Sequence, residues 1–80
     1  MVTYKEARTE YDVFRKNLKY YRHKLQMTQE MLAERSDLST SYIKQIESGK
    51  EFKNISLTTL LKLSKALGVS INTLFQKEKK

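Results

Sequence analysis

The sequence predicts an all-α domain of five helices, and three observations support this prediction. The chain of 80 residues contains no proline and only two glycines, so it has almost no residues that break a helix. Apolar residues recur at helical spacing along most of its length. Four segments share one pattern, in which an apolar residue precedes Ser or Thr and a second apolar residue follows four positions after the hydroxyl.

The first helix is expected near 11–25, because one apolar stripe recurs along it. The stripe consists of Phe14, Leu18, Tyr21 and Leu25. The helix begins somewhere between Thr3 and Tyr11. We therefore divide the chain into an N-terminal extension (1–10), a domain (11–77) and a basic tail (78–80). The extension either lengthens the first helix, adds to a dimer contact or stays mobile.

The shared pattern predicts four more helix starts. The hydroxyl in each can accept a hydrogen bond from an unpaired amide of the first turn, and the apolar pair can close over it. Gly49 and Gly68 suit the left-handed conformation that ends many helices. The starts are Thr28, Ser39, Ser56 and Ser70, and the helices are expected near 28–36, 39–48, 56–67 and 70–77.

The predicted core collects the inward-facing apolar residues of these helices. Its members are Phe14, Leu18, Tyr21, Leu25, Leu32, Ala33, Ile43, Ile46, Leu60, Leu61, Leu67, Ile71 and Leu74. A chain of this size buries only roughly 60% of its unfolded surface, so the core is small. There is no cysteine, so neither a disulfide nor a thiolate metal site adds stability.

The chain carries sixteen basic and nine acidic residues, a net charge of +7, which predicts attraction to a polyanion. The alternative is an ordinary solvated surface.

No apolar run approaches the roughly 18 residues of a membrane span, and the start is charged from Lys5 onward, so no signal peptide is expected. We therefore expect a soluble cytoplasmic protein with no membrane partner.

The helix expected at 39–48 carries the strongest functional signal. Ile43 and Ile46 define its inward side. Ser41, Lys44, Gln45 and Ser48 fall on the opposite side, and Thr40 and Tyr42 lie on the flanks. Gln can pair with adenine, Lys with guanine, and Ser or Thr with either base. This face lacks the Glu–Lys pairs of an ordinary solvated face, so recognition of DNA bases is favoured over that alternative.

The distribution of charge supports sequence-specific binding. Residues 27–49 carry two basic and four acidic residues. Residues 1–26 carry seven basic and three acidic residues, and residues 50–80 carry seven basic and two acidic residues. Phosphate contacts position a protein on duplex DNA and base contacts specify the sequence. Basic flanks around a helix with little net charge therefore fit a specific binder better than a non-specific one.

Several segments match a known family. They are Arg22, Thr28-Gln29 with Leu32-Ala33, Ser39 through Ile43, Ile46-Glu47 with Gly49-Lys50, and residues 60–75. Over about Leu18 to Phe75 the chain resembles the phage-repressor-like helix-turn-helix family (Cro/C1, XRE-type) of bacterial and phage transcription regulators. Residues 41–43 and 53–57 look similar to the small controller proteins of restriction–modification systems. The family often has glycine where this chain has Gln26 and Asp37, and proline near Asn54; Asp tolerates the left-handed region better than most residues.

This resemblance implies a compact, lambda-repressor-like five-helix domain with the helix-turn-helix at helices two and three. It implies a homodimer bound to a two-fold operator in double-stranded DNA, with the third helix in the major groove and no cofactor, metal or small-molecule ligand. Base contacts are expected from Thr40, Ser41, Lys44 and Gln45. Backbone contacts are expected from Gln29, Ser39, Tyr42, Ser48, Lys50, Lys53 and Asn54, although the flanking position of Tyr42 suits partial burial equally well.

The resemblance also implies a structural ion pair between Arg22 and Glu47. The alternative is a pair of exposed charges, which would contribute only about 0–1 kcal/mol.

Two other classes of protein are weighed against this interpretation. An enzyme is disfavoured, because His23 is the only histidine and no Ser–His, Cys–His or metal cluster can be assembled. An antitoxin-like interaction module that also binds DNA is the second alternative. Its contact residues would be Phe52, Phe75, Tyr4, Tyr11 and Tyr20, which suit a dimer interface or the packing of the extension equally well.

Overall fold

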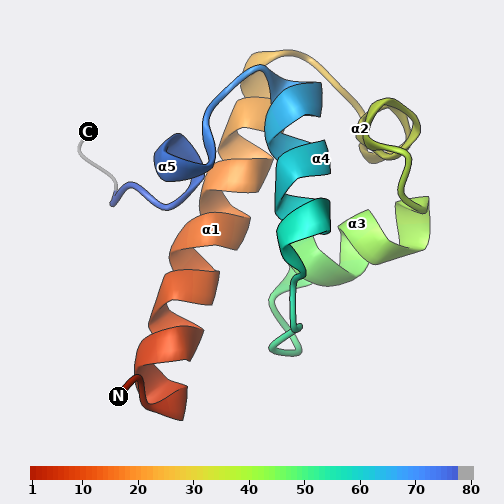
Figure 1. The fold of residues 1–80 in the computed structure, drawn as a ribbon. Coiled ribbons are helices and arrows are strands. Elements are labelled where there is room, and N and C mark those ends of the chain that lie inside the picture. The colour runs from red at the N-terminus through yellow and green to blue at the C-terminus, as the bar shows by residue number, and fades with distance from the viewer. Residues whose placement is uncertain (78–80) are drawn as a thin grey trace.

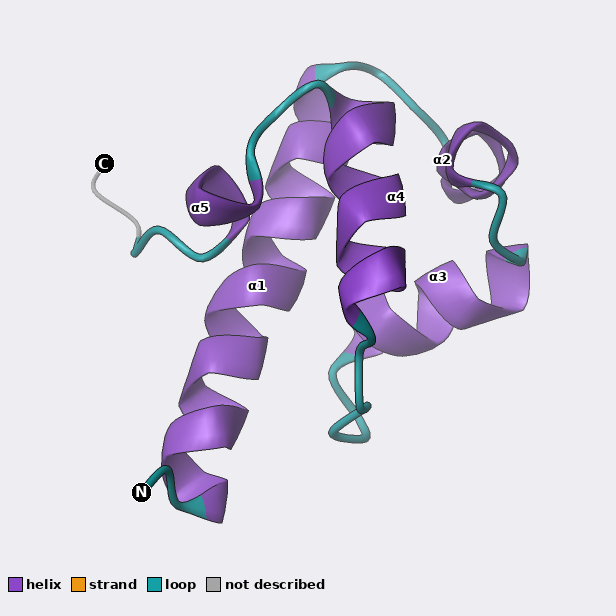
Figure 2. Cartoon of the chain, in the orientation of Figure 1, coloured by secondary structure: helices purple, strands orange, loops and turns teal. Residues whose placement is uncertain are grey.

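The computed structural model describes residues 1–77, so the predicted tail at 78–80 lies outside the described residues. The described chain is all-helical, as predicted. Its helices are α1 (Tyr4–Lys24), α2 (Gln29–Ser36), α3 (Thr40–Ser48), α4 (Leu57–Leu67) and α5 (Ile71–Leu74) (Figure 2).

The four predicted helix starts are confirmed by their capping bonds. Thr28, Ser39, Ser56 and Ser70 each have extended backbone, and each side-chain oxygen accepts from the amide three residues later, at 3.0–3.1 Å. These bonds satisfy amides that have no partner within the helix. The local pattern in the sequence therefore located these helices correctly.

The first helix begins at the early end of the expected interval. Thr3 and Glu6 form a capping box, in which the Thr3 hydroxyl accepts from the Glu6 amide and the Glu6 carboxylate accepts from the Thr3 amide. Residues 4–10 therefore continue the same helix as residues 11–24, and the start expected near residue 11 was too late.

Three helices end in the same left-handed motif. After α1, the amide of Met27 donates to the Arg22 carbonyl and the amide of Gln26 donates to the His23 carbonyl. The same pair of bonds closes α2 and α4, with Asp37 and Gly68 at the left-handed position. Gln26 and Asp37 have φ of 58° and 59°, a left-handed conformation that glycine adopts more readily than other residues.

The helices pack around one core. α2 packs against α3 and α4, α1 packs against α3 and α5, and α4 packs against α5. In Figure 1, α2 is seen end-on while α3 runs across the view, so their axes cross. The buried apolar residues are Tyr11, Phe14, Leu18, Met27, Leu32, Ala33, Ile43, Ile46, Leu63, Leu67 and Leu74.

Two predicted core residues are on the surface. Leu25 is 48% exposed because α1 ends before it, and Met27, beyond the turn, is buried in the core instead. Leu61 is 45% exposed because it lies on the opposite side of α4 from Leu63, one of the residues of this helix that face inward. Tyr21, Leu60 and Ile71 are only partly buried, and the sequence interpretation missed Tyr11, Met27 and Leu63.

The fifth helix is shorter than the predicted 70–77. It ends at Leu74, and the buried side chain of Asn17 in α1 donates to the carbonyls of Leu74 and Gln76, both at 2.8 Å. The carbonyls at the end of a helix lack partners within it, so this amide supplies a partner from α1 and fastens the end of α5 to that helix.

The left-handed conformation of Gln26 gives a testable prediction. A side chain in this conformation costs roughly 1–2 kcal/mol, and glycine relieves the cost but loses more entropy on folding. We expect Gln26→Gly to raise the free energy of unfolding by about 1 kcal/mol in urea titrations. Asp37→Gly is the matched control, and it should gain less stability than Gln26→Gly, because Asp adopts the left-handed conformation more readily than Gln. Unchanged or lower stability of Gln26→Gly would contradict the prediction.

Candidate nucleic-acid interface

The candidate interface is the outer face of α3. Ile43 and Ile46 are fully buried and hold the helix against the core. Ser41, Lys44 and Gln45 are exposed on the other side. The face predicted from helical periodicity therefore exists as a surface. The contacts of its side chains with bases stay predictions.

Residues on the flanks of α3 are less accessible. Thr40 and Tyr42 are half-buried, and the Tyr42 ring packs against the core, as its flanking position allowed. Ser39 is exposed, but its oxygen caps the helix. The Ser48 hydroxyl donates to the Gln45 carbonyl at 3.0 Å and accepts from the Lys50 amide at 3.3 Å, so it organises the end of the helix.

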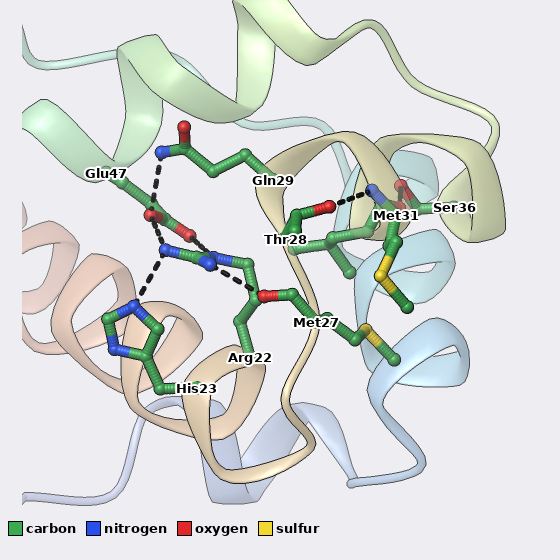
Figure 3. A network of polar contacts seen from close by, with 9 residues as sticks. Arg22, His23, Met27, Thr28, Gln29, Met31, Ser36 and Glu47 are labelled. Atoms are coloured by element: carbon green, nitrogen blue, oxygen red, sulfur yellow. Dashed lines mark hydrogen bonds and ion pairs between the residues drawn. The ribbon is translucent and has the colours of Figure 1, made fainter.

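A buried ion pair fixes the carboxyl end of α3. The Arg22 guanidinium donates twice to the Glu47 carboxylate, at 2.7 and 2.8 Å, and once to the Met27 carbonyl, at 2.8 Å (Figure 3). The two side chains are only 7% and 3% exposed. The alternative of two exposed charges is therefore wrong. The pair ties α1, the turn after it and α3 into one arrangement.

The same carboxylate orients Gln29 at the start of α2. The Gln29 amide donates to Glu47 at 3.0 Å, as Figure 3 shows. His23 lies on the other side of the guanidinium, with its Nε2 atom 3.2 Å from an Arg22 nitrogen. Because arginine can only donate, this ring nitrogen is the acceptor. His23 is thus a neighbour of the ion pair on the protein surface.

An open polar cleft of about 470 Å³ joins these elements. It is lined by Lys19, Arg22, Thr28, Gln29, Glu30, Lys44, Glu47 and Ser48. The cleft brings the amino end of α2, which carries a partial positive charge, next to the ammonium groups of Lys19 and Lys44. Because Arg22 and Glu47 neutralise each other, Lys19 and Lys44 outweigh the Glu30 carboxylate, and the remaining positive charge suits an anion such as a phosphate. The sequence interpretation missed Lys19, although it lies one helical turn before Arg22.

The loop after α3 carries the remaining predicted backbone contacts. Lys50 and Asn54 are exposed, whereas the Lys53 side chain is 24% exposed and its ammonium lies 3.2 Å from the Glu51 carboxylate. A smaller cleft of about 210 Å³ brings Gln45 and Ser48 of α3 together with Lys50 and Glu51. Ser48 lines both clefts, so Gln29, Lys44, Gln45 and Lys50 border one continuous surface. Lys53 and Asn54 instead line a third cavity, beside α1.

Two other kinds of site are not found among residues 1–77. These residues include no group of three or more His, Cys, Asp or Glu side chains that could hold a metal ion. Within the same residues, no helix has both the length and the apolar character needed to cross a membrane.

The ion pair gives a second prediction. Glu47→Ala leaves Arg22 buried without its partner, which typically costs about 3–5 kcal/mol. We expect a loss of this size in denaturant unfolding. The control is the double variant Arg22→Met with Glu47→Leu, which removes both charges and keeps apolar bulk. It should recover most of the loss, and a double variant as unstable as Glu47→Ala would contradict this account.

Comparison with known proteins agrees with this geometry. The helix-turn-helix family model matches residues 18–74. The control protein C.SmaI of Serratia marcescens is 34% identical over 67 residues, covering 84% of this chain and 77% of that protein. The control protein C.MunI of a Mycoplasma species is 39% identical over 57 residues, covering 71% of this chain and 74% of that protein.

Solved structures show the same fold. The restriction–modification controller protein C.AhdI of Aeromonas hydrophila superposes with a TM-score of 0.75 at 34% identity, covering 84% of this chain and 98% of that one. A hypothetical transcription factor from Neisseria superposes with a TM-score of 0.76 at 28% identity. The match covers 84% of this chain and 75% of that one. This chain therefore belongs to the Cro/C1-type (XRE) helix-turn-helix family, whose members are DNA-binding transcription regulators rather than enzymes.

Proposed function

We propose that this protein controls transcription of a restriction–modification system, binding a two-fold operator as a homodimer with α3 in the major groove. The observation that carries the proposal is the outer face of α3, which offers hydroxyl, amide and ammonium groups while Ile43 and Ile46 are fully buried. Such groups match the donors and acceptors on base edges in the major groove. The controller role is supported by similarity to C.SmaI, C.MunI and C.AhdI.

In this proposal the side chains divide into two roles. Thr40, Ser41, Lys44 and Gln45 read bases. Gln29, Ser39, Tyr42, Ser48, Lys50, Lys53 and Asn54 face the DNA backbone, and the polar cleft beside Gln29 receives a phosphate. The bonds that Ser39, Ser48 and Gln29 already make hold them in place, so their share of phosphate binding is smaller than that of the lysines.

A dimer follows from the small size of this surface. A nine-residue helix presents few side chains to the bases, and each mismatched base pair typically costs only about 1–3 kcal/mol. Two copies double the number of bases read. A symmetric dimer places the half-sites about 34–36 Å apart, one turn of the duplex. Leu57 and Leu61 of α4 are 65% and 45% exposed and one turn apart, and they offer apolar surface to the second subunit.

The antitoxin-like alternative has less support. All five of its candidate contact residues pack within this chain: Tyr11 is buried, Phe75 stacks on Phe14, Tyr4 and Tyr11 both contact Phe52, and the Tyr20 ring meets Tyr21 edge-on. Packing within the chain accounts for these aromatic residues without a partner protein.

Base reading is tested at Gln45. We expect Gln45→Ala to weaken binding to the preferred site by roughly 1–3 kcal/mol and to relax the preference at one base position, because a bidentate contact with a base is lost. The measurement is selection of sites from a random duplex library, followed by titration of single-base variants. If Gln45→Ala and the parent protein select identical sites, Gln45 does not read a base.

Backbone contact is tested at Lys50. We expect Lys50→Ala to weaken binding to all sequences alike and to reduce the slope of log K against log salt by about one, because one phosphate contact and its counterion release are lost. Lys65→Ala is the matched control, since Lys65 is an exposed lysine in the last turn of α4. The salt slope of the Lys65→Ala variant should stay near that of the parent protein. A change in base preference in Lys50→Ala would contradict the assignment.

A further inference from the structure

The amino-terminal half of α1 contacts the loop between α3 and α4. This half lies outside residues 18–74, the segment matched by the family model. Figure 1 shows the loop projecting from the helices toward the end of the molecule where α1 begins. The contacts join residues about forty positions apart in the sequence, and they involve the loop that carries Lys50 and Lys53.

Two arginines of α1 hold the start of this loop. The Arg8 guanidinium donates to the Gly49 carbonyl at 2.7 Å. The Arg15 guanidinium packs so closely on Gly49 that a Cβ atom there would collide with it. Gly49 also has a φ of 68°, a conformation that side chains disfavour. Glycine therefore suits this position both for its backbone conformation and for the space it leaves to Arg15.

Asp12 holds both arginines in position. Its carboxylate lies 2.9 Å from Nε of Arg15 and 3.5 Å from Nε of Arg8. Burial alone would raise the pKa of this carboxyl, but the hydrogen bond and charge of Arg15, together with the charge of Arg8, lower it below its ordinary value. Because a carboxylate sits between the two guanidinium groups, this cluster is a poor place for a phosphate.

Aromatic rings hold the middle of the loop. The Phe52 ring meets Tyr4 edge-on, with ring centres 5.4 Å apart, and meets Tyr11 at 5.2 Å. Tyr11 is buried, and this burial raises the pKa of its hydroxyl, while the nearby backbone of Lys53 and the charges of Arg15 and Arg8 partly offset the rise. A cavity of about 200 Å³ lies between α1 and the loop, and its lining includes Tyr11 of α1 together with residues 52–55 of the loop.

We propose that Tyr4, Arg8 and Tyr11 are positioning residues, which hold the loop at 49–55 in the conformation that brings Lys50 and Lys53 to the DNA backbone. This inference rests on the proposed DNA-binding function. A loop that is ordered before binding does not lose conformational entropy when it meets the duplex, so the lysines bind more tightly than they would from a mobile loop. The amino-terminal half of α1 then acts on DNA through the loop, without touching DNA itself.

The experiment compares Tyr4→Ala and Arg8→Gln with Tyr20→Ala in the full chain. Tyr4 is 71% exposed, so its loss spares the core, and Tyr20 is a tyrosine of the same helix whose ring contacts Tyr21 instead of the loop. Hydrogen exchange at the loop amides is measured without DNA. We expect exchange to be roughly threefold to tenfold faster in Tyr4→Ala and Arg8→Gln, and unchanged in Tyr20→Ala.

DNA titrations then separate positioning from direct contact. Both loop variants should bind every duplex roughly threefold to tenfold more weakly, with the salt slope of the parent protein. An unchanged rate of hydrogen exchange at the loop amides would overturn the proposal. A salt slope reduced by about one in Arg8→Gln would overturn it as well, since Arg8 would then contact a phosphate. Failure of the parent protein to prefer any DNA sequence would instead overturn the proposed function, whereas the exchange experiment would still test the loop contact.

Discussion

The buried ion pair between Arg22 and Glu47 is the constraint on which the interface depends. Removing two charges from water costs several kcal/mol for each ion, and this cost is offset only where every hydrogen bond is made. Arg22 reaches both carboxylate oxygens of Glu47 and the Met27 carbonyl, and Gln29 donates a further bond to the carboxylate. These bonds form together only when α1, the α1–α2 turn and α3 meet in one geometry. The pair therefore contributes orientation more than net stability.

Orientation matters because α3 is short. A helix of nine residues is not stable alone in water, so its structure comes from its surroundings. Ser39 caps its first turn, Ile43 and Ile46 anchor its inner side, and Glu47 fixes its last turn. With both ends and one side fixed, the polar outer face has a defined position relative to the cleft at Gln29 and to the loop that begins at Gly49.

What could be predicted from the sequence was decided by distance along the chain. The caps at Thr28, Ser39, Ser56 and Ser70 were predictable, because each bond spans three residues. The polar face of α3 was predictable for the same reason, since helical periodicity is local. The Arg22–Glu47 pair came only from family resemblance, because nothing local links residues 25 positions apart.

The errors arose where distant residues compete with local preference. At the end of α5, the chain is held by the amide of Asn17, which comes from another helix. Met27 takes the core position expected of Leu25, because the left-handed Gln26 redirects the chain between them. The contact between α1 and the loop was equally hidden, since Tyr11 and Phe52 gave no local sign that they would meet. The capping box at Thr3 and Glu6 was the exception, a local signal that was present in the sequence and overlooked.

Three arginines and three lysines of the protein have different surroundings. Arg8, Arg15 and Arg22 are bound by carboxylates, and Arg8 and Arg22 also donate to backbone carbonyls. Among residues 1–77, Lys19, Lys44 and Lys50 form no ion pair, and all three are exposed on the proposed DNA-binding side. A guanidinium presents several donors in a rigid plane and suits fixed acceptors, whereas an ammonium on a flexible stem can follow a phosphate. Arg8, Arg15 and Arg22 therefore fix the shape of the proposed interface, whereas Lys19, Lys44 and Lys50 are left available for an anionic duplex; Lys53 differs from these lysines because it pairs with Glu51.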